Sequence, residues 1–215
     1  MMSFNFHAGD LKVFAKALAL NGKHMMDGLI NTYNKALHLN PADARKIYMD
    51  VANQRRDKGD YDGAIRNYEK VLEVDHAGLD AMYEIGRIHL RTGQAVKAIE
   101  FFSRVTSLDR SNAAAWFHLG SSYFMMDDNS KALAAFNEAL RLNPNDADAH
   151  YKQGLVHDAL SNPDAAIESY RKAIALRPKF HKAYQSLGLA YEGKGMRAEA
   201  VKYFQKALEM EEKNA

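Results

Sequence analysis

A single pattern of residues recurs along this chain of 215 residues at intervals of 34. Its clearest copy begins at Ala113 and consists of Trp116, Leu119, Gly120, Tyr123, Ala132, Phe136, Ala139 and Pro144. The same pattern occurs in two further copies toward the C-terminus and two toward the N-terminus, each 34 residues from the last. An internal repeat of this length builds an array of small stacked units instead of one large core. The repeat therefore constrains the fold more than any other feature of the sequence.

Each copy divides into two helical halves. Residues that end helices stand near its middle: Gly59, Gly93, Asn129, Asn162 and Gly195. Pro144 and Pro178 then separate copies, because proline cannot continue the second helix. Small residues recur in both halves, which lets paired helices approach closely. The sequence therefore predicts one pair of antiparallel helices in each copy.

This arrangement resembles the tetratricopeptide repeat, whose signature the copy at Ala113 matches at every position. The resemblance implies an all-α fold, an α-solenoid in which the repeats stack into a right-handed superhelix. We expect about 80% helix, far above the roughly one third of an average domain. Five repeats are expected, over residues 45–78, 79–112, 113–146, 147–180 and 181–215. Residues 1–44 are less regular and are expected to form a degenerate N-terminal helical repeat.

Composition excludes several classes of function. The chain is 47% hydrophobic and 26% charged, which is typical of a folded soluble protein. It has no cysteine, so disulfides, thiolate zinc sites and thiol chemistry are excluded. A net charge of +2 is too weak for a nucleic-acid footprint. The sequence has neither a secretory signal at its start nor an apolar run long enough to span a membrane, so we expect a cytoplasmic location.

Catalytic and cofactor motifs are missing from the sequence. It contains no phosphate-binding loop, zinc-protease motif or nucleophile elbow, so we expect a protein that is not an enzyme and needs no cofactor. His150 and His157 lie seven residues apart on one predicted helix and could in principle share a metal. Both occupy packing positions of the repeat, which favours a structural role and no metal site.

The resemblance implies that first helices line a concave face, with repeat positions 2, 5, 9 and 12 directed into it. The candidate groove residues are Met49, Asn53, Arg56, Tyr83, Arg87, Phe117, Ser121, Phe124, Tyr151 and Asp158. Their aromatic stripe favours a groove for an amphipathic helix or an extended peptide. The alternative is that several rings pack against neighbouring first helices. The carboxylate clamp of chaperone-tail readers is rejected, because its Lys and Asn positions hold Met49 and Glu84.

Positive charge gathers near the C-terminal end of the chain, where residues 169–191 contain no acid. The candidate basic patch consists of Arg171, Lys172, Arg177, Lys179 and Lys182. Such a cluster can hold an acidic protein face or an anionic membrane surface. The alternative is that Arg177 and Lys179 only complement the negative end of a helix. Nucleic acid is not expected, because the rest of the chain does not sustain the charge.

Within the repeat family, the layout resembles the magnetosome-associated tetratricopeptide proteins of magnetotactic bacteria. The resemblance rests on residues 23–28, 44–48, 56–59 and 186–200, and on the total length. It implies a peripheral scaffold that coats the magnetosome membrane from the cytoplasmic side, forms homo-oligomers and contacts other magnetosome-associated proteins. The alternative function is a monomeric adaptor that binds a peptide or helix of an unrelated partner.

The irregular N-terminal segment offers a candidate occupant for the groove. In residues 10–20, Leu11, Phe14 and Leu18 form an apolar stripe, with Lys12 and Lys16 on the other side. We expect this self-docking helix to lie in the groove of another copy. The acids expected to meet its lysines are Asp80, Asp148 and Asp158.

Overall fold

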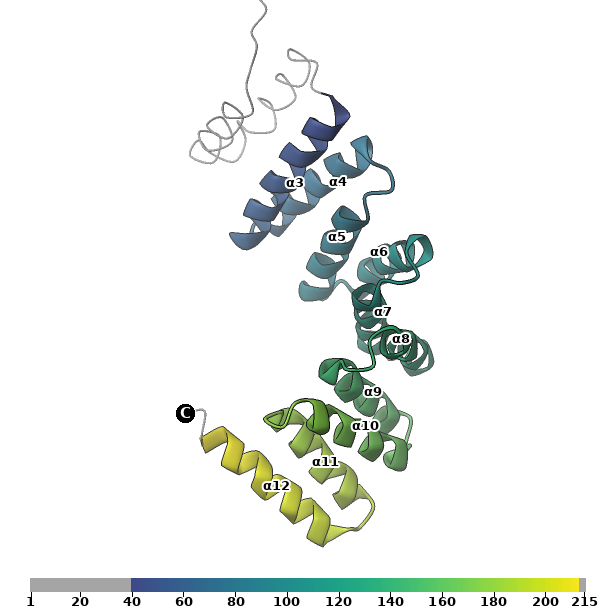
Figure 1. Cartoon of the computed structure of the whole chain (residues 1–215), viewed down its shortest axis with the longest axis vertical. Helices are drawn as coiled ribbons and strands as arrows, with labels where there is room; N and C mark the ends of the chain where they lie inside the picture. The colour runs from purple at the N-terminus through teal and green to yellow at the C-terminus, as the bar shows by residue number, and fades with distance from the viewer. Residues whose placement is uncertain (1–39, 213–215) are drawn as a thin grey trace, which may run out of the picture. The chain divides into compact units, whose positions relative to one another are not determined.

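The computed structural model describes residues 40–212, and every regular element in that range is an α-helix (Figure 1). The helices are α3 (Pro41–Asp57), α4 (Tyr61–Val74), α5 (Leu79–Arg91), α6 (Ala95–Leu108), α7 (Ala113–Met125), α8 (Asn129–Leu142), α9 (Ala147–Ala159), α10 (Pro163–Leu176), α11 (His181–Gly193) and α12 (Arg197–Glu212). The prediction of an all-α tetratricopeptide solenoid is confirmed. The predicted self-docking residues Leu11, Phe14 and Leu18, with most of the predicted degenerate repeat, lie outside the described residues.

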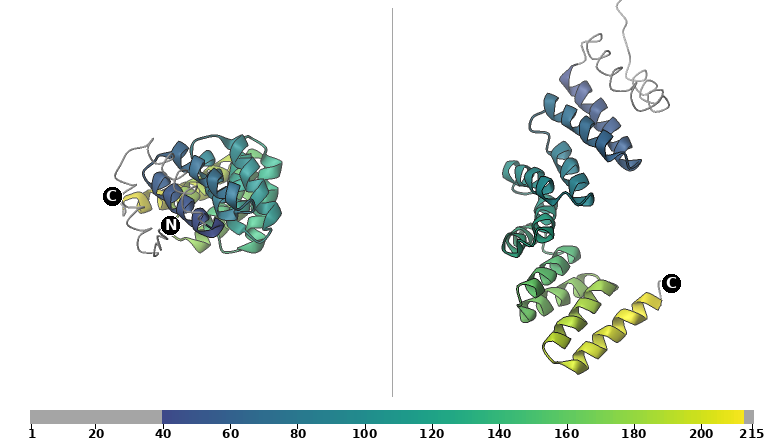
Figure 2. Two further views of the ribbon diagram at one scale, coloured as in Figure 1. Left: turned by 90° about the horizontal axis from the view of Figure 1, so that it is seen from above. Right: turned by 180° about the vertical axis from the view of Figure 1, so that it is seen from behind.

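The chain divides into two compact units, residues 1–84 and residues 85–215. The described part of the first unit holds α3, α4 and the start of α5; the second holds the rest of α5 and α6 to α12. Successive first helices begin at Leu79, Ala113, Ala147 and His181, which keeps the predicted spacing of 34 residues. Within the second unit, α9 to α12 follow one another as antiparallel pairs (Figure 2).

The first helix pair departs from the predicted repeat at its start. Helix α3 begins at Pro41 and not at residue 45. The Asn40 side chain caps it by accepting a hydrogen bond from the Asp43 backbone N–H at 2.9 Å. Proline fits the first turn of a helix because the missing N–H would have no helical partner there. Pro41 therefore starts a helix here.

Left-handed residues end the first helix of each pair. Gly59, Gly93 and Gly195 have φ angles of 77°, 78° and 74° at these turns. Asp127 and Ser161 occupy the same place in other pairs with φ of 57°, although they are not glycines. A left-handed residue after a helix closes its last turn and reverses the chain. A residue in the left-handed conformation therefore ends the first helix of every pair. It is a glycine in three pairs, and Asp127 or Ser161 in the other two.

Within each pair in the second unit, a glycine of the first helix lies against a ring of the second. A Cβ atom added to Gly86, Gly120, Gly154 or Gly188 would lie 2.9, 2.9, 2.4 or 2.6 Å from the ring it faces. The rings are those of Phe102, Phe136, Tyr170 and Phe204, and the first three are fully buried. Any larger residue at these glycines would push the two helices apart.

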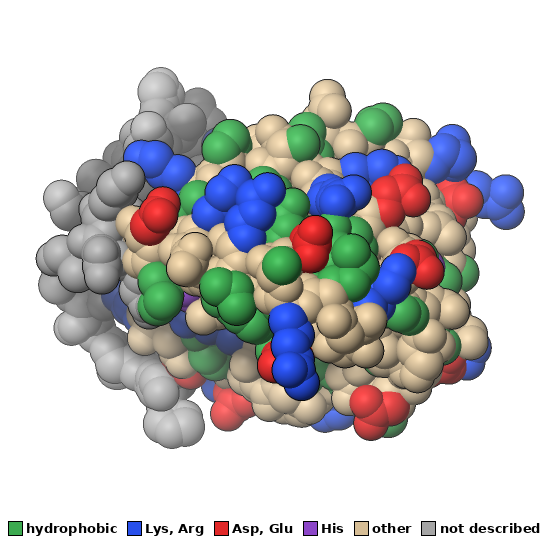
Figure 3. Space-filling model, turned by 90° about the horizontal axis from the view of Figure 1, so that it is seen from below, with side chains coloured by type: hydrophobic (Ala, Val, Ile, Leu, Met, Phe, Trp, Pro, Cys, Tyr) green, Lys and Arg blue, Asp and Glu red, His purple; other side chains and the backbone are tan. Residues whose placement is uncertain are grey.

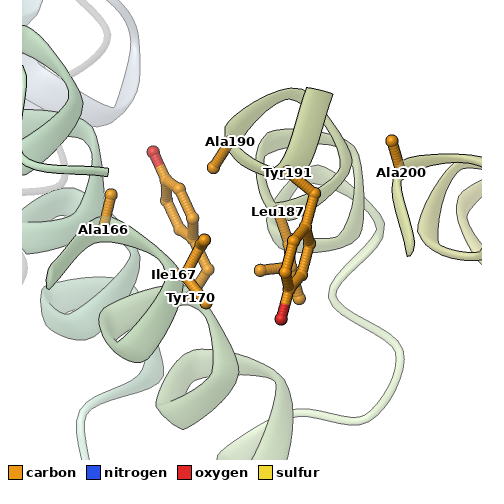
Figure 4. Packing of buried hydrophobic residues seen from close by; sticks show 7 residues of the cluster. All are labelled: Ala166, Ile167, Tyr170, Leu187, Ala190, Tyr191 and Ala200. Atoms are coloured by element: carbon orange, nitrogen blue, oxygen red, sulfur yellow. The ribbon is translucent and has the colours of Figure 1, made fainter. Parts of the chain in front are cut away.

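Contacts between pairs extend the core along the second unit. Second helices pack on the first helix of the next pair, as α6 does on α7, α8 on α9 and α10 on α11. In the cluster around α11, Ile167 and Tyr170 of α10 face Leu187, Ala190 and Tyr191 of α11 (Figure 4). Because each pair buries its neighbour's apolar face, no pair in this stack has a complete core of its own.

First helices also contact one another, α7 with α9 and α9 with α11, so they form a continuous layer in the second unit. Among the described residues, no helix is long and apolar enough to cross a membrane.

Two histidines sit in the packing position that tyrosine occupies in other pairs. His89 is 6% exposed and stacks on Phe101, and His157 is half-buried. Burial lowers the pKa of both imidazoles, and Lys97 lowers that of His89 further. The charged imidazole is therefore disfavoured in the folded chain.

We predict that Gly120→Val destabilises the second unit by about 1–3 kcal/mol, because its Cβ meets the Phe136 ring. Thermal and urea unfolding followed by circular dichroism measures the change. Gly193→Val is the control, since a Cβ there meets no atom within 4 Å. Equal melting temperatures for the two variants would contradict the close packing of Gly120 on Phe136.

We also predict that stability falls on acidification from about pH 7.5 to pH 5.5. Near the ordinary histidine pKa of about 6.5, the unfolded chain binds protons that buried His89 and His157 do not. His157→Tyr should reduce this loss of stability, because it removes one of the two imidazoles. Tyr123 and Tyr191 already occupy the same repeat position, so the ring should fit. Melting temperatures at both pH values measure it, with exposed His76→Gln as control. An equal loss of stability in wild type and His157→Tyr would show that His157 does not contribute to the pH dependence.

Candidate binding groove

The first-helix layer of the second unit presents one side of α7, α9 and α11 away from the core. On α11, Lys182, Gln185, Leu189 and Glu192 fill the predicted inward positions, and all four are exposed. Leu189 is 59% exposed, whereas Leu187 and Ala190 beside it are buried. This exposed side carries the helical spacing expected of a groove-lining face.

The predicted aromatic residues of this face are shared between the groove and the core. Phe117 and Phe124 are half-buried and pack against the buried cluster that contains Phe136. Tyr151 is half-buried too, and its ring centroid lies 4.9 Å from that of Phe180. Part of the surface of each ring therefore packs inside the protein, and only the exposed part is available to a ligand.

The predicted polar residues of this face have partners inside the protein. The Ser121 hydroxyl donates to the Phe117 carbonyl at 3.0 Å. The Tyr170 hydroxyl donates to the Asp158 carboxylate at 2.5 Å. Burial raises the pKa of Asp158, and this hydrogen bond opposes the rise. Arg87 of α5 is exposed in the same unit.

The other predicted groove residues lie in the first unit. Met49 and Tyr83 are half-buried there. Asn53 accepts a hydrogen bond from the Tyr68 hydroxyl at 2.7 Å, and burial raises the pKa of Tyr68 to about 12. Arg56 pairs with Glu84 at 2.8 Å and with Asp57 at 2.9 Å. Asn53 and Arg56 thus belong to one polar network around the Tyr68 ring.

Two of the acids expected to meet a docked helix already have cationic partners. Arg45 donates two hydrogen bonds to Asp80, at 2.7 and 2.8 Å, in the first unit. Arg177 forms a two-pronged pair with Asp148, at 3.0 and 2.5 Å, in the second. Both carboxylates therefore already have an arginine partner, and a contact between them and incoming lysines stays a prediction.

The predicted basic patch is divided by similar pairs. Arg171 donates to the Tyr191 hydroxyl, and Lys172 pairs with Glu168 at 2.6 Å. Arg177 holds Asp148, and its guanidinium lies over the Phe180 ring at 4.5 Å. Lys179 and Lys182 are exposed. Side chains from two helices, α10 and α11, and the loop between them thus share the charge. Figure 3 shows lysine and arginine spread among hydrophobic side chains on one face.

Lys152 of α9, next to Tyr151 in the sequence, is a half-buried cation that sequence reasoning did not single out. Burial lowers the pKa of its ammonium, which neighbouring Lys182 of α11 lowers further. No ion pair joins either lysine to a carboxylate among residues 40–212. Two lysines on first helices of consecutive repeats were the only signal in the sequence, and helical spacing alone did not show that their charges interact.

Comparison with known proteins identifies the family. The sequence profile of the tetratricopeptide repeat matches residues 50–113, 103–147, 119–179 and 151–215. A crystal structure of MamA protein is 48% identical, with a TM-score of 0.75, over 80% of this chain and 94% of that chain. This chain belongs to the MamA-like tetratricopeptide repeat proteins. A second crystal structure of MamA is also 48% identical to this MamA-like chain, with a TM-score of 0.74, over 77% of it and 97% of that chain.

More distant structures share the fold of this MamA-like chain. MamA residues 41 to the end from Desulfovibrio magneticus RS-1 are 24% identical, with a TM-score of 0.76, over 80% of this chain and 97% of that chain. YrrB, described as a tetratricopeptide repeat protein with an unusual peptide-binding site, is 20% identical, with a TM-score of 0.70, over 84% and 91%. No curated protein sequence matches significantly. In the described part of the chain, no group of three or more His, Asp or Glu residues could hold a metal.

The two buried tyrosines that reach the groove positions of this MamA-like chain form a matched pair for mutation. We predict that Tyr170→Phe costs about 1.5–3 kcal/mol, because the hydroxyl bonds a charged acceptor, Asp158. Tyr68→Phe should cost about 0.5–1.5 kcal/mol, because its short hydrogen bond, at 2.7 Å, is to neutral Asn53, and the bond from charged Arg56 is longer, at 3.4 Å. Phe102 and Phe136 occupy the same repeat position, so the ring alone is tolerated. Urea unfolding measures both changes, and a larger loss for Tyr68→Phe would contradict the ranking.

Proposed function

We propose that this chain is a scaffold that assembles with copies of itself on the cytoplasmic face of the magnetosome membrane. The exposed side of α7, α9 and α11 serves as its peptide-binding groove. Exposure of Leu189 carries this proposal. It is 59% exposed at the repeat position that half-buried Leu155 holds in the preceding repeat, so apolar surface is left for a partner. The scaffold works without catalysis, as other tetratricopeptide repeat proteins do.

Relationship to MamA supports the assignment to magnetosomes. Identity of 48% extends over most of this chain and nearly all of the MamA crystal structure. On the basis of this relationship we propose magnetosome association, homo-oligomers and contact with other magnetosome-associated proteins. The membrane contact is peripheral and uses the exposed cations of the basic patch, Lys179 and Lys182, on an anionic surface.

Self-assembly uses residues 10–20 of one copy as the segment that enters the groove of the next. Leu11, Phe14 and Leu18 supply an apolar stripe of helical spacing. The groove supplies Leu189, Leu155 and the free surface of Tyr151. Such a head-to-tail contact is heterologous, so it can add further copies instead of closing at a dimer.

The alternative is a monomeric adaptor whose groove takes a peptide of an unrelated partner. Its support is the same exposed apolar surface, together with the peptide-binding site named for YrrB, a protein of the same fold. The two functions differ in what the isolated chain does. A scaffold assembles alone, and an adaptor stays monomeric until its partner is added.

We predict that Leu189→Arg weakens assembly at least tenfold, because a charge enters the apolar contact without a partner. Val96→Arg is the matched control, since Val96 is 66% exposed but lies on the second helix α6. Sedimentation velocity over a range of concentrations measures both, and a chain lacking residues 1–40 should sediment as a monomer. Assembly by the truncated chain, or normal assembly by Leu189→Arg, would contradict docking of residues 10–20 in the groove. A wild-type chain that stays monomeric would favour the adaptor.

A further inference from the structure

Three large apolar side chains are exposed on the last helix pair of the second unit. Leu189 of α11 is 59% exposed, and Val201 and Leu208 of α12 are 53% and 58% exposed. Both helices belong to one compact unit and pack directly on each other. Large apolar side chains gathered on one exposed helix pair indicate a surface that a partner covers. We call the surface of Leu189, Val201 and Leu208 the α12 site.

The same three repeat positions are covered in the preceding pair, where they hold Leu155, Ile167 and Ile174, each 34 residues earlier. Ile167 is only 7% exposed, and the other two are half-buried. Leu155 and Ile174 pack against the buried cluster that contains Ile167. Helix α11 contributes Leu187, Ala190 and Tyr191 to this cluster (Figure 4). The first helix of the next pair is therefore what covers these positions.

The junction between α8 and α9 shows the same arrangement. Leu133 of α8 corresponds to Val201, and it packs against a cluster that contains Val156 of α9. Val156 in turn corresponds to Ala190 of α11. Second helices of the unit thus present one recurring face to a first helix, and on α12 this face is exposed. The structure itself therefore shows the kind of helix that fits the α12 site.

Residues 8–22 have the sequence of such a first helix. Leu11, Phe14, Ala15 and Leu18 stand at the spacing of the repeat signature, with one small residue among three apolar ones. Gly22 follows Ala15 at the interval that separates the small residue from the left-handed glycine after α3, α5 and α11. The corresponding residues of α11 and its turn are Tyr184, Leu187, Gly188, Tyr191 and Gly195.

This register gives the segment the face with which α11 packs on α10. In α11 the face consists of Leu187, Ala190 and Tyr191. At the same positions the segment has Phe14, Ala17 and Leu18. Each set combines two large side chains with one alanine between them, so the segment has the shape that a second-helix face accepts.

The lysines of the segment fall on another side of the helix. Lys12 and Lys16 correspond to Gln185 and Leu189, which are exposed on the groove side of α11. Their ammonium groups therefore remain in water beside the groove. Asp10 departs from the signature, because a buried alanine holds its position in α11. Aspartate is a helix-capping residue, so the docked helix begins after it.

We propose that residues 8–22 of a second copy dock on the α12 site as the next first helix of the array. This inference rests on the proposed function, and it names the surface that receives the self-docking segment. Phe14, Ala17 and Leu18 cover α12, and Leu189 is covered as Leu155 is by α11. A helix laid only along the groove would leave Val201 and Leu208 exposed. Each added copy thus continues the stack of repeats of the copy before it.

The first test changes the exposed face of α12 in the full-length chain. Val201→Arg with Leu208→Arg should weaken assembly at least tenfold in sedimentation velocity, because two charges enter an apolar contact. Val96→Arg with Leu108→Arg is the matched control, since these apolar residues of the second helix α6 are 66% and 58% exposed. Circular dichroism checks that each variant is folded. Normal assembly of the α12 variant, or an equal loss in the control, overturns the α12 site.

Cross-linking locates the segment without a destabilised variant, because the chain has no cysteine and each introduced thiol is unique. Between α10 and α11, Arg171 donates to the Tyr191 hydroxyl, so these two positions face each other. Gln205 and Leu18 are the corresponding positions of two copies. A Leu18→Cys chain mixed with a Gln205→Cys chain should therefore give a cross-linked heterodimer with a short bismaleimide. Ser121→Cys, at a predicted groove position of α7, is the control acceptor.

The outcomes separate the α12 site from the proposed function. Cross-linking through Gln205→Cys and not through Ser121→Cys supports docking on α12. Cross-linking through Ser121→Cys alone places the segment along the groove, which overturns the α12 site and leaves the proposed self-assembly standing. Equal cross-linking of both acceptors, or of neither, also overturns the α12 site. The proposed function fails separately, when the wild type is monomeric or a chain lacking residues 1–40 still assembles.

Discussion

Contact between a glycine and a ring is the interaction on which the rest of the second unit depends. Gly86, Gly120, Gly154 and Gly188 lie so close to the facing rings that a single added carbon would not fit. This contact sets the distance between the two helices of a pair. That distance determines which side chains of the pair are left to pack against the next pair. Because every pair uses the same contact, stacking repeats with one geometry and first helices form a continuous layer.

The layer of first helices presents the surface proposed to bind partners. The polar residues of this layer that already have partners inside the protein limit what this surface can bind. Tyr170 keeps its ring in the core while its hydroxyl reaches Asp158 at a groove position. Asp148 is held by Arg177. What remains is apolar surface around Leu189. Most charges of the groove thus stabilise the array, and a few are left for recognition.

Buried histidines connect the same packing to pH. At the position of His89 and His157, two other pairs have Tyr123 and Tyr191, which do not titrate near neutrality, and the first pair has Arg55. Burial lowers the pKa of both imidazoles, so the folded array favours histidine in its neutral form. Each histidine placed at this position therefore adds to the pH dependence of the stability of the array.

The sequence by itself determined the helices, their turns and their repeat, because these follow from local rules: spacing of apolar residues, glycine where φ is positive, and small residues opposite rings. It also predicted which helix faces line a groove, and that assignment stays a prediction. Only the tertiary structure decided which of those side chains are available. Arg177 and Asp148, for example, are 29 residues apart in the sequence but form an ion pair. Helical periodicity places a residue on a face, whereas its charge partner depends on side chains brought together by packing between repeats.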